Sequence, residues 1–183
     1  MTKDEAYDLL ARYVQSDWLK KHCLATAAVM KALAGRFQGD PELWWTAGLL
    51  HDLDFDLTQD PARHGLESAR ILRELGQRQE VIDSILAHNA EGLGGSRETS
   101  LDYALTCAET ITGLVTATAL VMPDQKLASV QPSSVVKRMK KKDFARKVSR
   151  ERILLCEKIG LSVEELAEAA VTAMQEIAGD LGL

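Results

Sequence analysis

The chain has 183 residues, enough for one domain with a substantial hydrophobic core that does not depend on disulfides. Its formal net charge of −5 and its pI near 5.4 argue against nucleic acid as the default partner. Three widely separated cysteines, Cys23, Cys107 and Cys156, form no CxxC pair, which excludes a zinc knuckle and a thioredoxin-like redox motif.

The N-terminal residues MTKDEAYDLL are charged and amphipathic and lack the apolar segment of a secretory signal. One long apolar stretch runs from Tyr103 to Pro123, but it contains five threonines, a glycine and Glu109. These polar residues favour a buried helix over a membrane span. We therefore expect a cytoplasmic protein that does not contact a membrane.

Helix signals occur along the whole chain, whereas no run of alternating β-branched residues and no hairpin signal is present. A first helix is predicted from Asp4, a second over 18–36 after Ser16 and Asp17, and a third from Pro41 to Leu50 or His51. A loop is expected over 52–63, followed by helices over about 64–75 and 79–90 and by the glycine-rich loop EGLGGSRETS. The apolar helix then ends at Pro123. Further helices are expected from Ser133 or Ser134 and over about 142–159, and a final helix is capped by Ser162 and Glu165. This order predicts an all-α, single-domain bundle over residues 1–183, with C-terminal helices over about 133–183.

The four histidines are the main functional signal. Helical periodicity directs His22, His51, His64 and His88 toward the core. Adjacent residues on a helix diverge by about 100°, so His51 and Asp52 can reach one ion only where the helix ends, as it does in LLHDLDFD.

Glu109 is the only charged residue between Asp102 and Asp124, and a buried acid is costly unless it is paired or bound to metal. A single inward histidine is usually an ordinary core residue. Four of them together with Asp52 and Glu109 predict a metal site. Imidazole and carboxylate ligands without thiolate favour one or two ions of manganese, iron, cobalt, nickel or zinc, with magnesium also compatible.

The ordered set His22, His51-Asp52, His64, His88 and an acid at 109 resembles the HD superfamily of metal-dependent phosphohydrolases over residues 18–115. The closest resemblance is to compact single-domain bacterial members with an H…HD…H…H…D pattern. The resemblance implies an HD-type helical bundle in which His22, His51, Asp52 and Glu109 hold a first metal. Asp52 would bridge to a second metal held by His64 and His88. The family commonly has aspartate where this chain has Glu109, which is one methylene longer.

The same resemblance implies that the protein cleaves a phosphate ester of a nucleotide or other small phosphorylated molecule through metal-activated water. Asp52 and Asp54 are the expected catalytic positions. Asp54 or Asp56 would orient a water or a metal-bound histidine, the alternative for both being a solvated loop. Two other functions stay open: a di-iron oxygenase of the HD type, and a catalytically inactive metal- or ligand-binding module, which the glutamate at 109 favours.

Cations for a phosphorylated substrate are concentrated in one stretch. Residues 137–152 contain nine basic and two acidic residues. On a helix, Lys147 and Arg150 would share a face suited to phosphate, and Arg97 in the glycine-rich loop would lie near the substrate. The alternative is a solvated basic helix paired with acids elsewhere. Dimerisation through the terminal helices is a further option that the sequence leaves open.

Overall fold

The computed structural model describes residues 1–183 and contains helices and turns but no strand, which confirms the all-α prediction. Five helices and a 3-10 turn make up the part before residue 89. They are α1 (Lys3–Tyr13), α2 (Asp17–Ala34), η1 (Gly35–Phe37), α3 (Pro41–Leu50), α4 (Leu66–Glu74) and α5 (Gln79–His88). The remaining elements are α6 (Ala90–Leu93), α7 (Ser100–Leu120), η2 (Leu127–Ser129), α8 (Pro132–Met139), α9 (Arg150–Leu154), η3 (Leu155–Ile159), α10 (Val163–Glu176) and α11 (Ala178–Leu181).

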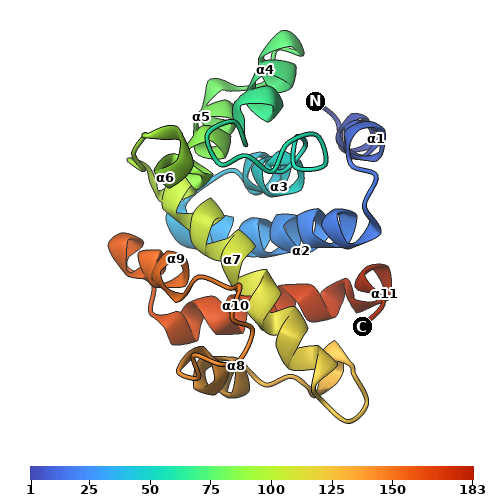
Figure 1. Cartoon of the computed structure of the whole chain (residues 1–183), viewed down its shortest axis with the longest axis vertical. Helices are drawn as coiled ribbons and strands as arrows, with labels where there is room; N and C mark the ends of the chain where they lie inside the picture. The colour runs from blue at the N-terminus through green and yellow to red at the C-terminus, as the bar shows by residue number, and fades with distance from the viewer.

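The long helix α2 crosses the middle of the molecule and separates two groups of helices (Figure 1). Helices α1 and α3 to α5 lie on one side of it, and α8 to α11 lie on the other. Helix α7 runs across α2 and packs against both groups (Figure 1). One cluster of 47 buried hydrophobic residues extends through both sides, so α2 and α7 form the centre of the core.

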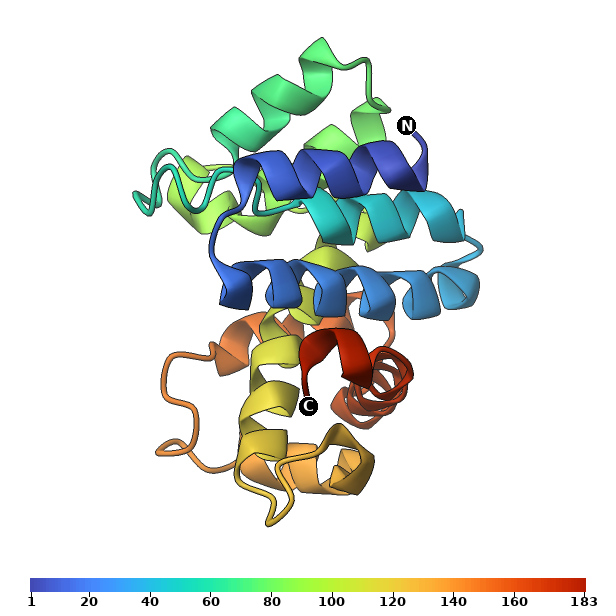
Figure 2. The same ribbon diagram turned by 90° about the vertical axis from the view of Figure 1, so that its right-hand side faces the viewer.

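Helices α1, α3 and α2 are stacked in that order (Figure 2). Because α3 lies between two helices, every residue from Leu43 to Leu50 is buried. It approaches α2 closely at Gly48, where an added Cβ atom would lie 2.8 Å from the Cα atom of Ala27. A glycine is therefore required for the backbones to approach this closely, and this contact sets the spacing between His22 on α2 and His51 at the end of α3.

The N-terminal helix boundaries agree closely with the sequence-based prediction. Asp40 caps α3 through the backbone N–H groups of Glu42 and Leu43, and Pro41 occupies the first turn. Residues 51–63 form turns, as expected for the segment after α3. The predicted glycine-rich loop is only partly irregular, because its first residues belong to α6.

The helix predicted over 142–159 is wrong in its first half, because only residues 150–159 are helical, as α9 and η3. Residues 140–149 form a loop of turns, and regular helix begins only at Arg150. The guanidinium of Arg150 explains this loop, because its five N–H groups donate to five backbone carbonyls. The acceptors are Met139, Lys141, Phe144, Ala145 and Val148. One partly buried cation thus satisfies carbonyls that a helix would have satisfied by its own N–H groups.

No helix combines the length and the hydropathy that a membrane crossing requires.

We expect Gly48→Ala to lower the free energy of unfolding by about 1–3 kcal/mol, because the new methyl group would force α2 and α3 apart. Urea denaturation monitored by circular dichroism measures this change. Gly35→Ala is the matched control, since Gly35 has helical dihedral angles and no atom lies within 4 Å of an added Cβ. Equal stability of the two variants would contradict the proposed close contact.

Candidate metal centre

The segment LLHDLDFD lies where α3 ends. His51 is the C-cap residue of α3, and the chain continues from it in turns. This turn allows two adjacent side chains to face one point, with His51 Nε2 lying 3.4 Å from Asp52 Oδ1. Both residues are buried. His51 and Asp52 therefore face one point at a helix end, as predicted from the sequence.

Four imidazole rings surround the Asp52 carboxylate. Its Oδ1 lies 3.2 Å from His64 Nε2 and 3.5 Å from His88 Nε2, and its Oδ2 lies 3.8 Å from His22 Nε2. The rings also approach each other in pairs, with Nε2–Nε2 distances of 3.2 Å for His22 and His51 and 2.9 Å for His64 and His88. Two triads result, His22-His51-Asp52 and Asp52-His64-His88, and each could hold one metal ion.

Backbone carbonyls fix the orientation of two rings. His51 Nδ1 donates to the carbonyl of Gly48 at 2.8 Å, and His88 Nδ1 donates to the carbonyl of Ile85. A carbonyl can only accept, so Nδ1 carries the proton and Nε2 of the neutral ring presents its lone pair to the cluster.

The His22 ring is oriented in the same sense by a side chain. The Thr112 hydroxyl donates to the Glu109 backbone carbonyl at 2.7 Å and so can only accept from His22 Nδ1, 3.2 Å away. The Nε2 lone pairs of His22 and His51 therefore face one another. This arrangement is repulsive unless a cation lies between them. A hydrogen bond that fixes Nδ1, the ring nitrogen facing away from the cluster, is typical of metal-binding histidines. The residues present thus fit a divalent metal.

His64 is oriented by Asp54. The Asp54 carboxylate accepts from His64 Nδ1 at 2.9 Å and from the backbone N–H groups of Gly65, Glu67 and Ser68 at 2.8 to 3.2 Å. It therefore caps the start of α4 and fixes the ring of His64 at the same time. Gly65 allows this sharp entry into the helix with a φ of +93°.

The charges of the cluster follow from burial and from these contacts. Burial lowers the pKa of His22 and of His51, so both rings are neutral. Burial opposes ionisation of Asp52, but interactions with the surrounding rings outweigh it and hold the Asp52 pKa well below its usual range. Burial would also lower the pKa of His64, yet hydrogen bonds to Asp52 and Asp54 raise it to about 9. A proton on His64 is therefore the counter-charge of Asp52 when no metal is bound.

Glu109 lies at the edge of the cluster rather than within either triad. One oxygen, Oε2, is 4.0 Å from His22 Nε2. The other, Oε1, accepts from Thr110 at 2.6 Å and pairs with the Arg152 guanidinium at 3.1 Å. A role for Glu109 as a ligand requires a small movement of its carboxylate and stays a prediction.

Arg152 is the cation that the sequence analysis missed. It donates to the backbone carbonyl of His88 as well as pairing with Glu109, so it joins α9 to the metal centre. Its Nε atom is buried without a partner. Nothing in the sequence distinguished it from the eight other cations of residues 137–152, because its partners lie on α5 and α7.

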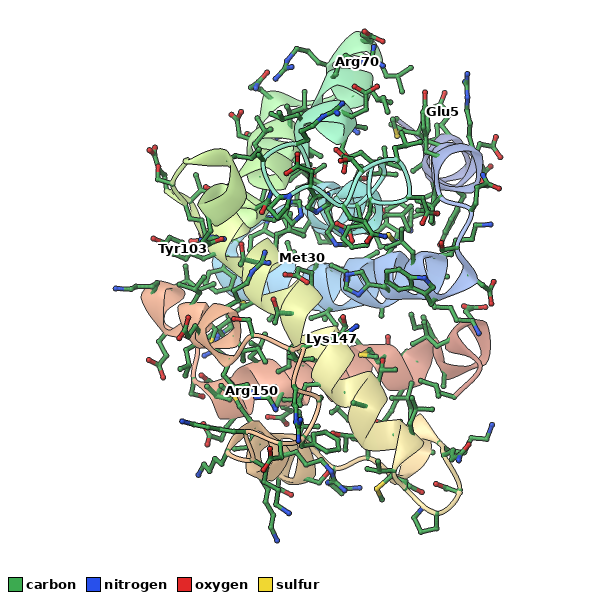
Figure 3. All side chains as sticks on the ribbon, viewed as in Figure 1. Glu5, Met30, Arg70, Tyr103, Lys147 and Arg150 are labelled. Carbon is green, nitrogen blue, oxygen red and sulfur yellow. The ribbon has the colours of Figure 1, made fainter.

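Two other predicted cations, Arg150 and Arg97, are bound by groups of the chain itself. Arg150 has no N–H group left for a phosphate, since all five bind backbone carbonyls. Arg97 is held by Glu91, by the Thr106 hydroxyl and by the His88 carbonyl. Lys147 is exposed beside the middle of α7 (Figure 3), and its substrate-binding role stays a prediction.

Asp56 does not face the cluster. Its carboxylate accepts from the backbone N–H groups of Gln15 and Ser16 and from the Ser16 hydroxyl, at 2.6 to 2.8 Å. It ties the turn after α3 to the start of α2. These contacts are neither those of a residue that orients a metal-bound histidine nor those of a freely solvated loop.

Comparison with known proteins agrees with this geometry. The HD domain family matches residues 19–120, more than half of the chain. The chain belongs to the HD domain family. This match contains all four histidines of the cluster, Asp52 and Glu109. No solved structure gives a significant match.

Three curated relatives of this HD chain carry the name Ribonuclease Y. The protein from Sulfurovum sp. (strain NBC37-1) is 34% identical over 88 residues, which cover 48% of this chain and 16% of that protein. Those from Cutibacterium acnes and Acidothermus cellulolyticus are 35% and 32% identical over 72 residues, covering 38% and 39% of this chain and 13% and 15% of theirs. The chain therefore spans about a sixth or less of the length of these relatives.

Metal binding is expected to depend on pH through His64. The raised pKa means that the ring carries a proton below about pH 9, and a metal must displace it. The apparent metal affinity should therefore rise about tenfold per pH unit up to pH 9 and level off above it. Calorimetric titration with zinc at pH 7.5, in buffers of different ionisation enthalpy, should show release of about one proton.

His64→Gln is the control for this proton, because glutamine can still donate to Asp54 but does not titrate. It should bind zinc more weakly and release about one proton fewer. A binding heat that does not vary between buffers in the wild-type protein would contradict the assignment of the displaced proton to His64.

Proposed function

We propose that this HD protein is a metal-dependent phosphohydrolase that cleaves a phosphate ester of a nucleotide or another small phosphorylated molecule. The observation that carries the proposal is the pair of triads that share the Asp52 carboxylate. His22, His51 and Asp52 would hold one divalent ion, and Asp52, His64 and His88 would hold a second. Manganese, iron, cobalt, nickel and zinc all suit this donor set, and magnesium is compatible with it.

Ions bound in these triads would activate a water molecule and neutralise the charge of the phosphoryl oxygens. The reaction joins the water oxygen to phosphorus and breaks the bond from phosphorus to the ester oxygen. The products are the alcohol and inorganic phosphate, and the alcohol oxygen takes up a proton of the water.

The protein's own groups supply position and charge. Asp54 keeps the His64 ring turned toward Asp52, so it acts as a positioning residue. Arg152 is the only guanidinium paired with a carboxylate of the cluster, at Glu109, and we assign to it the non-bridging phosphoryl oxygens of the substrate. The most exposed ring is His22, at 20%, whereas His51 and His88 are nearly inaccessible. Substrate would therefore approach from the side of His22, Glu109 and Arg152.

Replacing Asp52 tests the metal centre directly. Asp52→Ala removes the carboxylate shared by both triads, and we expect loss of bound metal and at least a 1,000-fold fall in kcat for any ester that the wild-type protein cleaves. The measurements are mass spectrometry of metals in the native, tag-free protein, a phosphate-release assay over nucleotides and sugar phosphates, and gel electrophoresis of an RNA substrate, because cleavage of a phosphodiester releases no free phosphate. Asp60→Asn is the control, since Asp60 is exposed in the same connecting segment.

The outcomes of this screen separate three functions. Metal-dependent release of phosphate supports the proposal. Abundant iron with oxygen-dependent loss of substrate would indicate a di-iron oxygenase instead. Bound metal without turnover in the wild-type protein and in Glu109→Asp would indicate a metal-binding module. RNA belongs in the panel because the relatives are named as ribonucleases.

Arg152 gives a second test. We expect Arg152→Gln to lower kcat/KM about 10- to 100-fold while the protein keeps its metal, because glutamine can hold the His88 carbonyl but lacks the charge for a phosphoryl oxygen. Steady-state kinetics beside metal analysis distinguish the two effects. Equal loss of metal and activity would show that Arg152 acts through the stability of the centre rather than on substrate.

A further inference from the structure

An apolar pocket adjoins the metal centre on its open side. Its volume is about 400 Å³, within the range of small-molecule sites. It lies between α2, α7 and the end of the chain and shares His22 with the metal centre. Its walls include Trp18, Lys21, Ala25, Thr116, Ala117 and Leu120.

Few side chains in this pocket can form hydrogen bonds. The Thr112 hydroxyl is already used, because it donates to the Glu109 carbonyl and accepts from His22. Lys21, Thr116 and the indole N–H of Trp18 are the remaining side-chain donors, and Lys21 already lies 3.7 Å from Asp17. A nucleobase carries several donors and acceptors around its edge, and most would lose water here without gaining a partner. That loss is unfavourable for each group left unpaired.

Aromatic rings continue the apolar surface from the pocket to the cluster. The Trp18 and Phe55 rings meet edge to face with centroids 5.8 Å apart, and Phe55 meets His64 in the same way at 5.2 Å. The Trp18 side chain is nonetheless exposed. A hydrocarbon in the pocket would cover Trp18 and keep water away from the neighbouring histidines.

Two cations lie near this surface. Lys21 is the one fully charged side chain in the pocket wall, and Arg152 pairs with Glu109 at the edge of the metal centre. A ligand with an anionic head and an apolar body matches these positions of charged and apolar groups. Its head would lie at the histidines and its body along Ala25, Ala117 and Leu120.

We propose that the pocket binds the organic group of the substrate, and that this group is a hydrocarbon, so that the preferred substrate is an alkyl or aryl phosphate rather than a nucleotide. This inference rests on the proposed function and narrows it. Burial of one methylene favours binding by a factor of about four, so four additional methylenes should strengthen binding about 100-fold or more.

Binding of non-hydrolysable phosphonates tests the pocket without requiring turnover. We expect the zinc-loaded protein to bind hexylphosphonate about 100-fold more tightly than ethylphosphonate, measured by calorimetry. Adenosine 5′-monophosphate should bind more weakly than hexylphosphonate. Ala117→Phe should reduce the ratio of the two phosphonate affinities at least tenfold because its ring fills the pocket, whereas Ala117→Ser, which keeps the volume, should largely preserve the ratio.

Failure of this inference is distinguishable from failure of the proposed function. Chain-length-dependent binding that Ala117→Phe abolishes supports the pocket even when the protein hydrolyses no ester. Equal binding of the two phosphonates, or tighter binding of the nucleotide, overturns the pocket assignment even when the protein hydrolyses esters. Metal analysis and thermal unfolding of both Ala117 variants establish that each is folded and loaded.

Discussion

The structure is organised around a buried carboxylate that four imidazole rings enclose. Asp52 is charged although water is largely excluded from it, so its charge requires a cation in direct contact. His64 can supply a proton, but the facing lone pairs of His22 and His51 have no proton between them. Divalent ions would remove both difficulties at once, because they neutralise the carboxylate and separate the nitrogens.

The rest of the fold serves to hold these rings in place. His22 comes from α2, His51 from the end of α3 and His88 from the end of α5. A carbonyl of its own helix orients His51 and likewise His88, and Thr112 on α7 orients His22. The close contact of α2 with α3 at Gly48 brings the first two together. Because the Nδ1 atom of each ring is held by a hydrogen bond, the rings cannot turn their Nε2 atoms away from the centre. The site is therefore preorganised for metal.

Sequence patterns predicted the cluster well and its surroundings poorly. Apolar periodicity and helix ends are local signals, and they sufficed for the helix boundaries up to α5 and for the four inward histidines. The loop over 140–149 gave a misleading signal, because its basic residues suit a helix while Arg150 binds carbonyls within the loop itself. Arg152 and the apolar pocket depend on segments that are far apart in the chain. Trp18, Ala117 and Leu181 line the same pocket, for example, and no local pattern encodes this.

Because Asp54 has two partners, it couples formation of the start of α4 to metal binding through His64. One carboxylate caps α4 and orients His64, so the helix start and the ring share the same hydrogen-bond acceptor. Thermodynamic reciprocity then applies: whatever free energy a well-formed α4 contributes to metal binding, bound metal returns to α4. Helix α4 is in this sense part of the metal centre, although it contributes none of the candidate metal ligands. Loosening of its first turn would release His64 before the other three rings.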